Sequence, residues 1–333
     1  MPIHAHAASA ARQQLAPFDY EPAPLGPHDV EVTITHCGIC HSDVHLVDND
    51  WGVSSYPLVP GHEIVGTVSA AGERVTHLQN GQRVGIGWQR GACLTCRYCT
   101  TGREPLCKDN QATCAGHYGG FADRIRVDSR FAFPIPDRLA SENAAPLLCG
   151  GITVYSPLRD FGVTPDMRVG VVGVGGLGHL ALQYARAWGC EVTAFSHSPD
   201  KEQAALAFGA HRFVTSTDAG AVRRAGGLDF ILSTVSADLD WNAYLDALAP
   251  GGTLCVVGVP QSAISVPAFA LIGGQKRVVG SPIGGRAAIM EMLDFSARHG
   301  IVATTEAVPF SEVNPALEKV RNNTVRYRMV LTG

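Results

Sequence analysis

Residues 168–178, Arg168-Val169-Gly170-Val171-Val172-Gly173-Val174-Gly175-Gly176-Leu177-Gly178, decide the fold of one half of this chain. The first five form a buried, β-branched strand pattern, and residues 177–188 carry apolar side chains at helical spacing. A Gly-x-Gly-x-x-Gly match is weak evidence alone, because it often marks a plain turn. Between a strand and a helix it predicts a dinucleotide site with the pyrophosphate at the helix N-terminus. The expected contacts are Gly173, Gly175, Gly176, Leu177 and Gly178.

The end of the next predicted strand, residues 191–195, bears on which dinucleotide binds. An NAD site would place Asp or Glu there, to bond the ribose 2′-hydroxyl. The chain instead continues Ser-His-Ser-Pro-Asp-Lys over residues 196–201. The acid in this segment lies at a predicted helix start, where it can cap the helix. We therefore expect NADP(H), with its 2′-phosphate bound by Ser196, Ser198 and Lys201.

Strands and helices continue to alternate after this segment. Residues 201–208 have helical spacing, and three further strands are predicted at 212–214, 229–233 and 253–258. Strands that alternate with helices indicate a parallel, doubly wound sheet of the Rossmann type.

The chain before residue 150 has a different pattern. Predicted strands at 30–35, 64–71 and 83–87 have no long helix between them, which favours a β-rich Greek-key barrel. The last residues contain two predicted helices and a strand, and we expect them to rejoin this first domain. The fold class is α/β. The expected domains are a β-rich catalytic domain of residues 1–150 and 286–333, and an inserted NADP-binding Rossmann domain of residues 151–285, with a cleft between them.

Composition excludes several classes of function. The chain has 333 residues, 46% of them apolar, which suits two domains of ordinary size. A net charge of −4 without a basic tract argues against a nucleic-acid partner. The apolar runs are too short to span a membrane, and the N-terminus does not have the pattern of a secretory signal. We expect a cytoplasmic protein, in which ten cysteines indicate metal binding rather than disulfides.

Four of these cysteines have the spacing Cys-x2-Cys-x2-Cys-x7-Cys. Such spacing allows one lobe to surround a tetrahedral zinc ion with four thiolates and no open position, which is a structural site. A chance cluster of buried thiols and an iron–sulfur cluster are the alternatives, but iron–sulfur spacings differ. The predicted structural ligands are Cys93, Cys96, Cys99 and Cys107.

A second set of donors lies in two segments, residues 37–45 and 61–63. Cys40 and His62 are the kind of ligands that hold a catalytic zinc, which needs a third protein ligand and an open position. We place the third at Cys149, at the presumed domain junction, although a lone cysteine there is more often simply buried. Glu63 is a candidate alternate ligand or a carboxylate behind the ligands. Asp43 is expected to accept the other ring N–H of His62, its alternative being a helix N-cap or a solvated acid.

These motifs together resemble those of the zinc-dependent medium-chain alcohol dehydrogenases, in the cinnamyl-alcohol-dehydrogenase-like branch, near the bacterial broad-range NADPH-dependent aldehyde reductases. The resemblance runs nearly end to end. It implies a GroES-like catalytic domain, two zinc ions per chain, and Cys40, His62 and Cys149 as catalytic ligands. One departure is a segment, residues 110–120, that looks shorter than in the plant cinnamyl enzymes, which favours a broader aldehyde range.

The resemblance also implies roles for residues outside the zinc sites. Ser42 and His45 match a proton relay. Thr153 matches a nicotinamide contact, Arg328 a pyrophosphate contact and His41 a phosphate contact, and Val259 falls in the cofactor set. The implied walls of the substrate pocket are Trp51, Trp88 and Ile283, although for the tryptophans core packing is equally open.

The expected function is reversible reduction of aldehydes to primary alcohols by hydride transfer from NADPH. Two alternatives stay open: an NAD-dependent alcohol or polyol dehydrogenase on the same scaffold, and a non-catalytic zinc- and nucleotide-binding protein. The family suggests a homodimer joined through the edge of the cofactor sheet.

Overall fold

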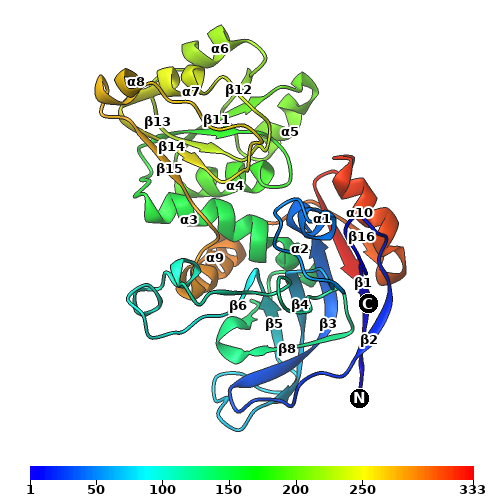
Figure 1. The fold of residues 1–333 in the computed structure, drawn as a ribbon. Helices are drawn as coiled ribbons and strands as arrows, with labels where there is room; N and C mark the ends of the chain where they lie inside the picture. Colours follow the sequence, from blue (N-terminus) through cyan, green and yellow to red (C-terminus); the bar gives the residue numbers. More distant parts are fainter. The chain divides into compact units, whose positions relative to one another are not determined.

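The computed structural model describes residues 1–333 and divides them into two compact units (Figure 1). The first unit combines Met1–Ile152 with Gly284–Gly333, and the second is Thr153–Ile283. None of the helices has both the length and the apolar character needed to cross a bilayer.

The first unit is built on a seven-stranded sheet whose centre is the long strand β3. Strand order is β16-β17-β3-β4-β5-β9, and β8 also pairs with β3. Hydrogen bonding thus defines an open path from β16 to β9 rather than a closed barrel. The bounds are β3 (Asp29–Ile39), β4 (Glu63–Ala71), β5 (Arg83–Ile86), β8 (Arg124–Asp128), β9 (Phe133–Pro134), β16 (Thr305–Pro309) and β17 (Arg328–Thr332).

Strand β3 runs farther than its alternating sequence predicts, since it continues to Ile39. Its first half pairs with β8 and its second half with β17, while β4 covers the opposite edge. The alternating residues Val30, Val32 and Ile34 are buried in the core of this unit. The extension matters because β3 ends directly before Cys40, and β4 begins directly after His62.

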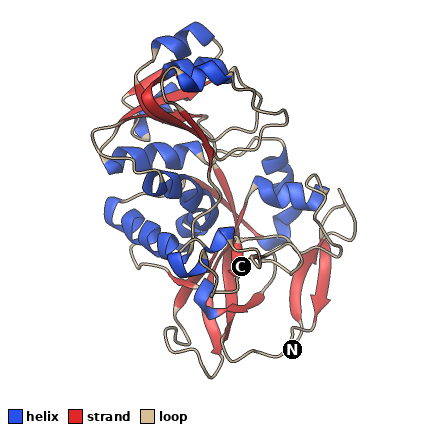
Figure 2. Cartoon of the chain, turned by 60° about the vertical axis from the view of Figure 1, so that its left-hand side comes forward, coloured by secondary structure: helices blue, strands red, loops and turns tan.

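Smaller elements complete the first unit. A hairpin near the N-terminus forms a separate two-stranded sheet (Figure 2). The further elements are β1 (Ile3–Ala7), β2 (Ala16–Tyr20), β6 (Gln89–Gly91), β7 (Gln111–Ala112), α1 (His41–Asp48), α2 (Ser141–Pro146), a π-helical turn η4 (Leu147–Gly151), α9 (Arg286–His299), α10 (Val313–Arg321), and the 3₁₀ turns η1 (Cys99–Thr101), η2 (Glu104–Leu106), η3 (Ser129–Phe131) and η6 (Phe310–Glu312).

The second unit is a six-stranded parallel sheet in the order β12-β11-β10-β13-β14-β15. Strand order reverses at β10, so right-handed crossovers place α4 and α7 on opposite faces of the sheet (Figure 1). The elements are α3 (Ile152–Asp160), β10 (Arg168–Val172), α4 (Gly178–Trp188), β11 (Glu191–Ser196), η5 (Pro199–Lys201), α5 (Glu202–Ala207), β12 (Arg212–Thr215), α6 (Ala219–Arg224), β13 (Leu228–Ser233), α7 (Trp241–Ala247), β14 (Leu248–Val256), α8 (Ala268–Ile272) and β15 (Arg277–Gly280).

Candidate metal and cofactor sites

Asp43 holds together the two segments that carry the first metal-ligand candidates. It lies in the first turn of α1 and has no exposed surface. One carboxylate oxygen accepts the backbone N–H of Cys40 at 2.9 Å, and the other accepts the backbone N–H of Gly61 at 2.8 Å. The second oxygen also accepts the Nδ1–H of His62 at 3.0 Å. A buried carboxylate with three N–H donors fixes the relative positions of Cys40 and His62.

The contact with Asp43 determines the tautomer of His62. Because a carboxylate only accepts hydrogen bonds, Nδ1 carries the proton and Nε2 presents its lone pair. That Nε2 atom is buried and has no hydrogen-bond partner. A buried acceptor without a partner is costly, and a metal ion is the group that satisfies it. Burial opposes the imidazolium form, but the charges of Asp43 and Cys149 outweigh it and raise the pKa of His62.

Cys149 joins this pair from a distant part of the chain. It lies in the π-helical turn η4 and is 7% exposed. Its sulfur is 3.9 Å from that of Cys40, and two thiolates at about 2.3 Å from a tetrahedral zinc ion would be about 3.8 Å apart. One donor atom from each of Cys40, His62, Glu63 and Cys149 falls within a 4.8 Å cluster. The donor set therefore fits zinc.

Electrostatics at the two thiols favour a shared negative charge. Hydrogen bonding with Cys149 lowers the pKa of Cys40 well below its usual range, against the effect of burial. The same contact, together with burial, raises the pKa of Cys149. A cation between the two sulfurs would release the remaining proton, since metal ligands must be deprotonated.

Glu63 is buried behind these donors and is paired with Arg328. Arg328 donates from Nη2 to Oε1 of Glu63, while Oε2 of Glu63 has no partner. Burial raises the pKa of Glu63 to about 7 even with Arg328 beside it. Gly38 opposes Glu63 across β3 and β4, and a Cβ at Gly38 would lie 2.0 Å from the Glu63 carboxylate. Only glycine leaves room there. Arg328, which the resemblance assigns to the pyrophosphate, is 6% exposed in this ion pair.

The relay candidates Ser42 and His45 lie three residues apart on α1 and so share one face. The sulfur of Cys40 is 3.7 Å from the hydroxyl of Ser42. His45 contacts Asp50 through Nδ1 and Oδ2 at 2.8 Å, which leaves its Nε2 free to accept a proton. Sequence reasoning missed Asp50 because it lies beyond the helix end, in a turn whose shape no local pattern specifies. His41 begins α1 and is exposed.

Trp88 packs its ring edge-to-face on His62, with centroids 4.9 Å apart. Trp51 is 38% exposed, and its ring centroid lies 6.2 Å from that of Trp88 and 5.1 Å from that of His45. The two tryptophans therefore adjoin the metal donors and the relay. Ile283, the third predicted pocket residue, is the last residue of the second unit.

A thiol that the sequence analysis left unassigned also reaches His62. The sulfur of Cys114 is 3.8 Å from Nδ1, and the side chain is completely buried. Burial raises the pKa of Cys114, so it remains a thiol beside the His62–Asp43 contact. Nothing in its local sequence distinguishes it from an ordinary core cysteine.

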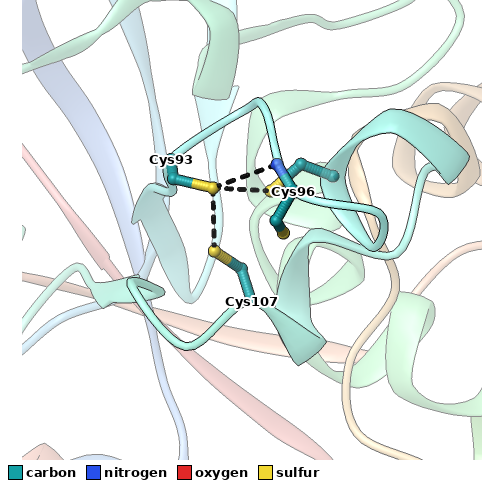
Figure 3. Close-up of side chains that lie close together, drawn as sticks. Cys93, Cys96 and Cys107 are labelled. Carbon is teal, nitrogen blue, oxygen red and sulfur yellow. Dashed lines mark hydrogen bonds between the residues drawn. The ribbon is translucent and has the colours of Figure 1, made fainter.

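The four-cysteine cluster forms in the lobe between β6 and β7 (Figure 3). The Cys93 sulfur is 3.9 Å from that of Cys99 and 3.5 Å from that of Cys107, and it accepts the backbone N–H of Cys96 at 3.3 Å. Backbone hydrogen bonds from Thr95 and Cys96 lower the pKa of Cys93 to about 6. Four sulfurs that lie within 4.8 Å of one another fit a structural zinc ion.

In the second unit, the glycine loop follows β10 and precedes α4. Gly173 has φ +93°. A Cβ at Gly178 would lie 1.8 Å from the Gly173 carbonyl oxygen, whereas one at Gly175 would meet nothing within 4 Å. The first and third glycines thus make the turn, and the open space at Gly175 leaves its backbone accessible to a phosphate. Gly176 and Leu177 complete the loop, with Leu177 as the residue before α4.

The remaining cofactor candidates of this unit lie at strand and helix ends. Ser196 is the last residue of β11 and is buried, and its hydroxyl accepts the backbone N–H of Ser198 at 3.2 Å. Lys201 ends the turn η5 and is partly exposed. Thr153 is 9% exposed in α3, and Val259 is 62% exposed. No acid ends β11, so the carboxylate that a ribose 2′-hydroxyl would contact is missing there.

The second unit is a doubly wound sheet with a glycine loop. The first unit has one zinc donor set of three ligands that leaves a coordination position open, and one of four cysteines that fills every position. Together these features define a zinc-dependent dehydrogenase. Family profiles agree: residues 26–137 match the alcohol dehydrogenase GroES-like domain, and residues 176–298 match the zinc-binding dehydrogenase domain. The aldehyde reductase AdhA of Synechocystis is 46% identical over 331 residues, 99% of this chain and 98% of its own.

Two solved structures are similar over 100% of this chain and 98% of theirs. The cinnamyl alcohol dehydrogenase SbCAD4 of Sorghum bicolor has a TM-score of 0.96 and 41% identity. The cinnamyl alcohol dehydrogenase of Helicobacter pylori, solved with NADP(H), has a TM-score of 0.92 and 34% identity. The chain belongs to the zinc-containing medium-chain alcohol dehydrogenases, in their cinnamyl-alcohol-dehydrogenase-like branch. It is an oxidoreductase, as its sequence predicted.

Proposed function

We propose that this enzyme reduces aldehydes to primary alcohols, reversibly, with NADPH as the hydride donor. The observation that carries the proposal is the partnerless Nε2 of buried His62, which faces two thiols while Glu63 is held by Arg328. Three protein donors and no fixed fourth is the pattern of a catalytic rather than a structural zinc site.

The chain's own residues supply positioning and proton transfer in this proposal. Cys40, His62 and Cys149 would hold the zinc ion, whose chemistry is Lewis-acid polarisation of a carbonyl, while the nicotinamide supplies the hydride. Asp43 keeps the proton of His62 on Nδ1, so that Nε2 stays available. Ser42 would hand its hydroxyl proton to the product oxygen and recover one from Nε2 of His45.

Asp50 extends this relay. Its hydrogen bond with His45 holds one ring proton on Nδ1. When His45 gives up a proton from Nε2, it therefore always becomes the neutral tautomer that carries its proton on Nδ1. The His45 side chain is 32% exposed, which lets Nε2 take a new proton from water. Asp50 thus serves as a positioning residue for the relay.

The cofactor preference is supported by the end of β11. Ser196, Ser198 and Lys201 offer two hydroxyls and a cation, and β11 ends in a serine rather than in an acid that would repel a 2′-phosphate. The Helicobacter relative was solved with NADP(H), in accord with this choice.

The surroundings of the donors bear on the substrate range, and the edge of the cofactor sheet bears on the oligomeric state. The Synechocystis relative is named an aldehyde reductase, and Trp51 and Trp88 beside the donors suit an aryl or alkyl side chain. We therefore favour a broad aldehyde range. The edge strand β15 and the exposed side chains of Phe269 and Ile272, 85% and 69% accessible, support a homodimer through the cofactor sheets.

A panel of aldehydes assayed with NADPH and with NADH tests the function. We expect turnover of several aldehydes, with a higher kcat/KM for NADPH, and none in Cys40→Ser. Cys190→Ser, a buried thiol of the second unit, is the matched control and should retain activity. Preference for NADH with polyols would favour the polyol dehydrogenase instead. Failure of every aldehyde and alcohol in a protein loaded with two zinc ions would favour a non-catalytic binding protein.

A further inference from the structure

The first unit contains a cavity that is lined by none of the metal donors. Its volume is about 530 Å³, within the range of small-molecule sites. Its walls come from the end of the N-terminal hairpin, the turn of residues 55–57, strands β6 and β8, and the loop after β7. The lining residues that matter below are Tyr20, Tyr56, Arg90, Tyr118, Arg126 and Asp29.

One wall of this cavity is aromatic. The rings of Tyr20 and Tyr118 are 4.5 Å apart at 53°, and Phe18 packs edge-on against Tyr118 at 5.3 Å. Tyr56 donates its hydroxyl to the carbonyl of Val47 at 2.9 Å, which fixes that side chain. No protein group hydrogen-bonds the hydroxyls of Tyr20 and Tyr118. Such a wall suits a flat aromatic ligand.

Among the polar groups that line the cavity, the guanidinium of Arg90 forms no ion pair with a carboxylate. It donates only to the backbone carbonyl of Arg126. The neighbouring Arg126, in contrast, is paired with Glu31 at 2.7 Å. Burial lowers the pKa of Arg90, with Tyr20 and Asp29 opposing this effect.

Asp29 and Glu21 also line the cavity, yet neither forms an ion pair with Arg90, and Asp29 accepts the backbone N–H of Gly26. A half-buried guanidinium that forms no ion pair can accept a ligand carboxylate, which binds its planar fork through two parallel hydrogen bonds.

We propose that this cavity is a second ligand site that binds an aromatic carboxylate, with the carboxylate on Arg90 and the ring against Tyr20 and Tyr118. The site is independent of the reaction at zinc. Trp88, which packs on His62, directly precedes β6, and Arg90 is the middle residue of that strand, so the bound acid would contact a residue two positions from Trp88 along the chain.

The test is titration of the zinc-loaded protein with 2-naphthoate, with the heat of binding measured by isothermal titration calorimetry. We expect saturable binding of one 2-naphthoate per chain, weakened at least tenfold in Arg90→Gln and in Tyr118→Leu. The exposed, unpaired Arg138→Gln changes net charge equally and should leave binding unchanged. The neutral isostere 2-naphthamide should bind at least tenfold more weakly than 2-naphthoate.

Three results would overturn the proposal. Equal affinity for 2-naphthamide and 2-naphthoate would show that binding does not depend on the carboxylate. Undiminished affinity in both Arg90→Gln and Tyr118→Leu, each with a wild-type thermal transition, would place the probe elsewhere. Loss of binding in Cys40→Ser, a variant that leaves every cavity residue intact, would assign the probe to the metal site.

Discussion

Replacing Asp43 with asparagine isolates the contribution of one buried carboxylate to the metal site. The three N–H donors of Cys40, Gly61 and His62 lie 2.8–3.0 Å from its two oxygens. Asparagine keeps the shape but has a single acceptor oxygen, so at least one donor faces an NH₂ group instead. One buried donor left unsatisfied costs about 1–3 kcal/mol. Alanine would leave all three donors unsatisfied, and the summed free-energy cost would approach the whole stability of a domain.

The same substitution should weaken zinc at the catalytic site more than it weakens the fold. Loss of a group that orients a metal-bound histidine typically reduces metal affinity about 10–100-fold. We expect Asp43→Asn to bind one zinc ion as tightly as wild type, in the four-cysteine lobe, and the second about 10–100-fold more weakly. Competition with a chromophoric chelator measures both affinities.

Asp50→Asn is the matched control, since Asp50 also contacts a histidine, His45, which is not a proposed zinc ligand. It should keep both zinc ions at wild-type affinity while slowing turnover. If Asp43→Asn retained the second zinc ion at wild-type affinity, the proposed role of Asp43 would be refuted.

Three other substitutions test separate parts of the molecule. Ser196→Asp should lower the NADPH-to-NADH ratio of kcat/KM at least tenfold, because an acid repels the 2′-phosphate at a cost of about 1.4 kcal/mol or more; an unchanged ratio would remove the present account of cofactor choice. Burial alone would raise the pKa of Glu31, but the charges of Arg126 and Arg124 outweigh it and lower that pKa below its ordinary value of 4.5. The ion pairs of Glu31 with these arginines therefore stabilise the fold at a pH above 4.5, and the stabilisation is lost as the pH falls through the lowered pKa of Glu31. Glu31→Gln should therefore reduce the free energy of unfolding by about 1–3 kcal/mol at pH 7, with the deficit disappearing in urea titrations under more acidic conditions; a deficit independent of pH would contradict this. Phe269→Glu should convert a dimer to a monomer by light scattering, and a wild-type protein that is already monomeric would exclude the proposed interface.

Much of the second unit follows from local pattern, because a parallel sheet buries its strands on both faces and makes them continuously apolar. Strand β10 matches its prediction at both ends. Strand β15 was not predicted, since its short sequence, Arg-Val-Val-Gly, is recognisable only once β14 lies beside it. Helices α2 and α3 were also missed, because they flank the π-helical turn around Cys149 and carry internal prolines.

The metal donors were predictable as residue types but not as an arrangement. Spacing alone identified the four-cysteine lobe, since all four ligands lie within 15 residues. Cys149 is 109 residues from Cys40, and only the fold brings their sulfurs together. The pairing of Arg328 with Glu63 is likewise long-range, over 265 residues, and it gives Arg328 a partner that the resemblance did not imply.

Anomalous diffraction at the zinc edge, from crystals of the native protein, tests most directly whether Cys40, His62 and Cys149 converge on one zinc ion. We expect two peaks per chain, one among the four lobe sulfurs and one about 2.3 Å from the sulfurs of Cys40 and Cys149 and about 2.0–2.1 Å from Nε2 of His62. A single peak in the lobe, or a second peak bound by other residues, would contradict the account.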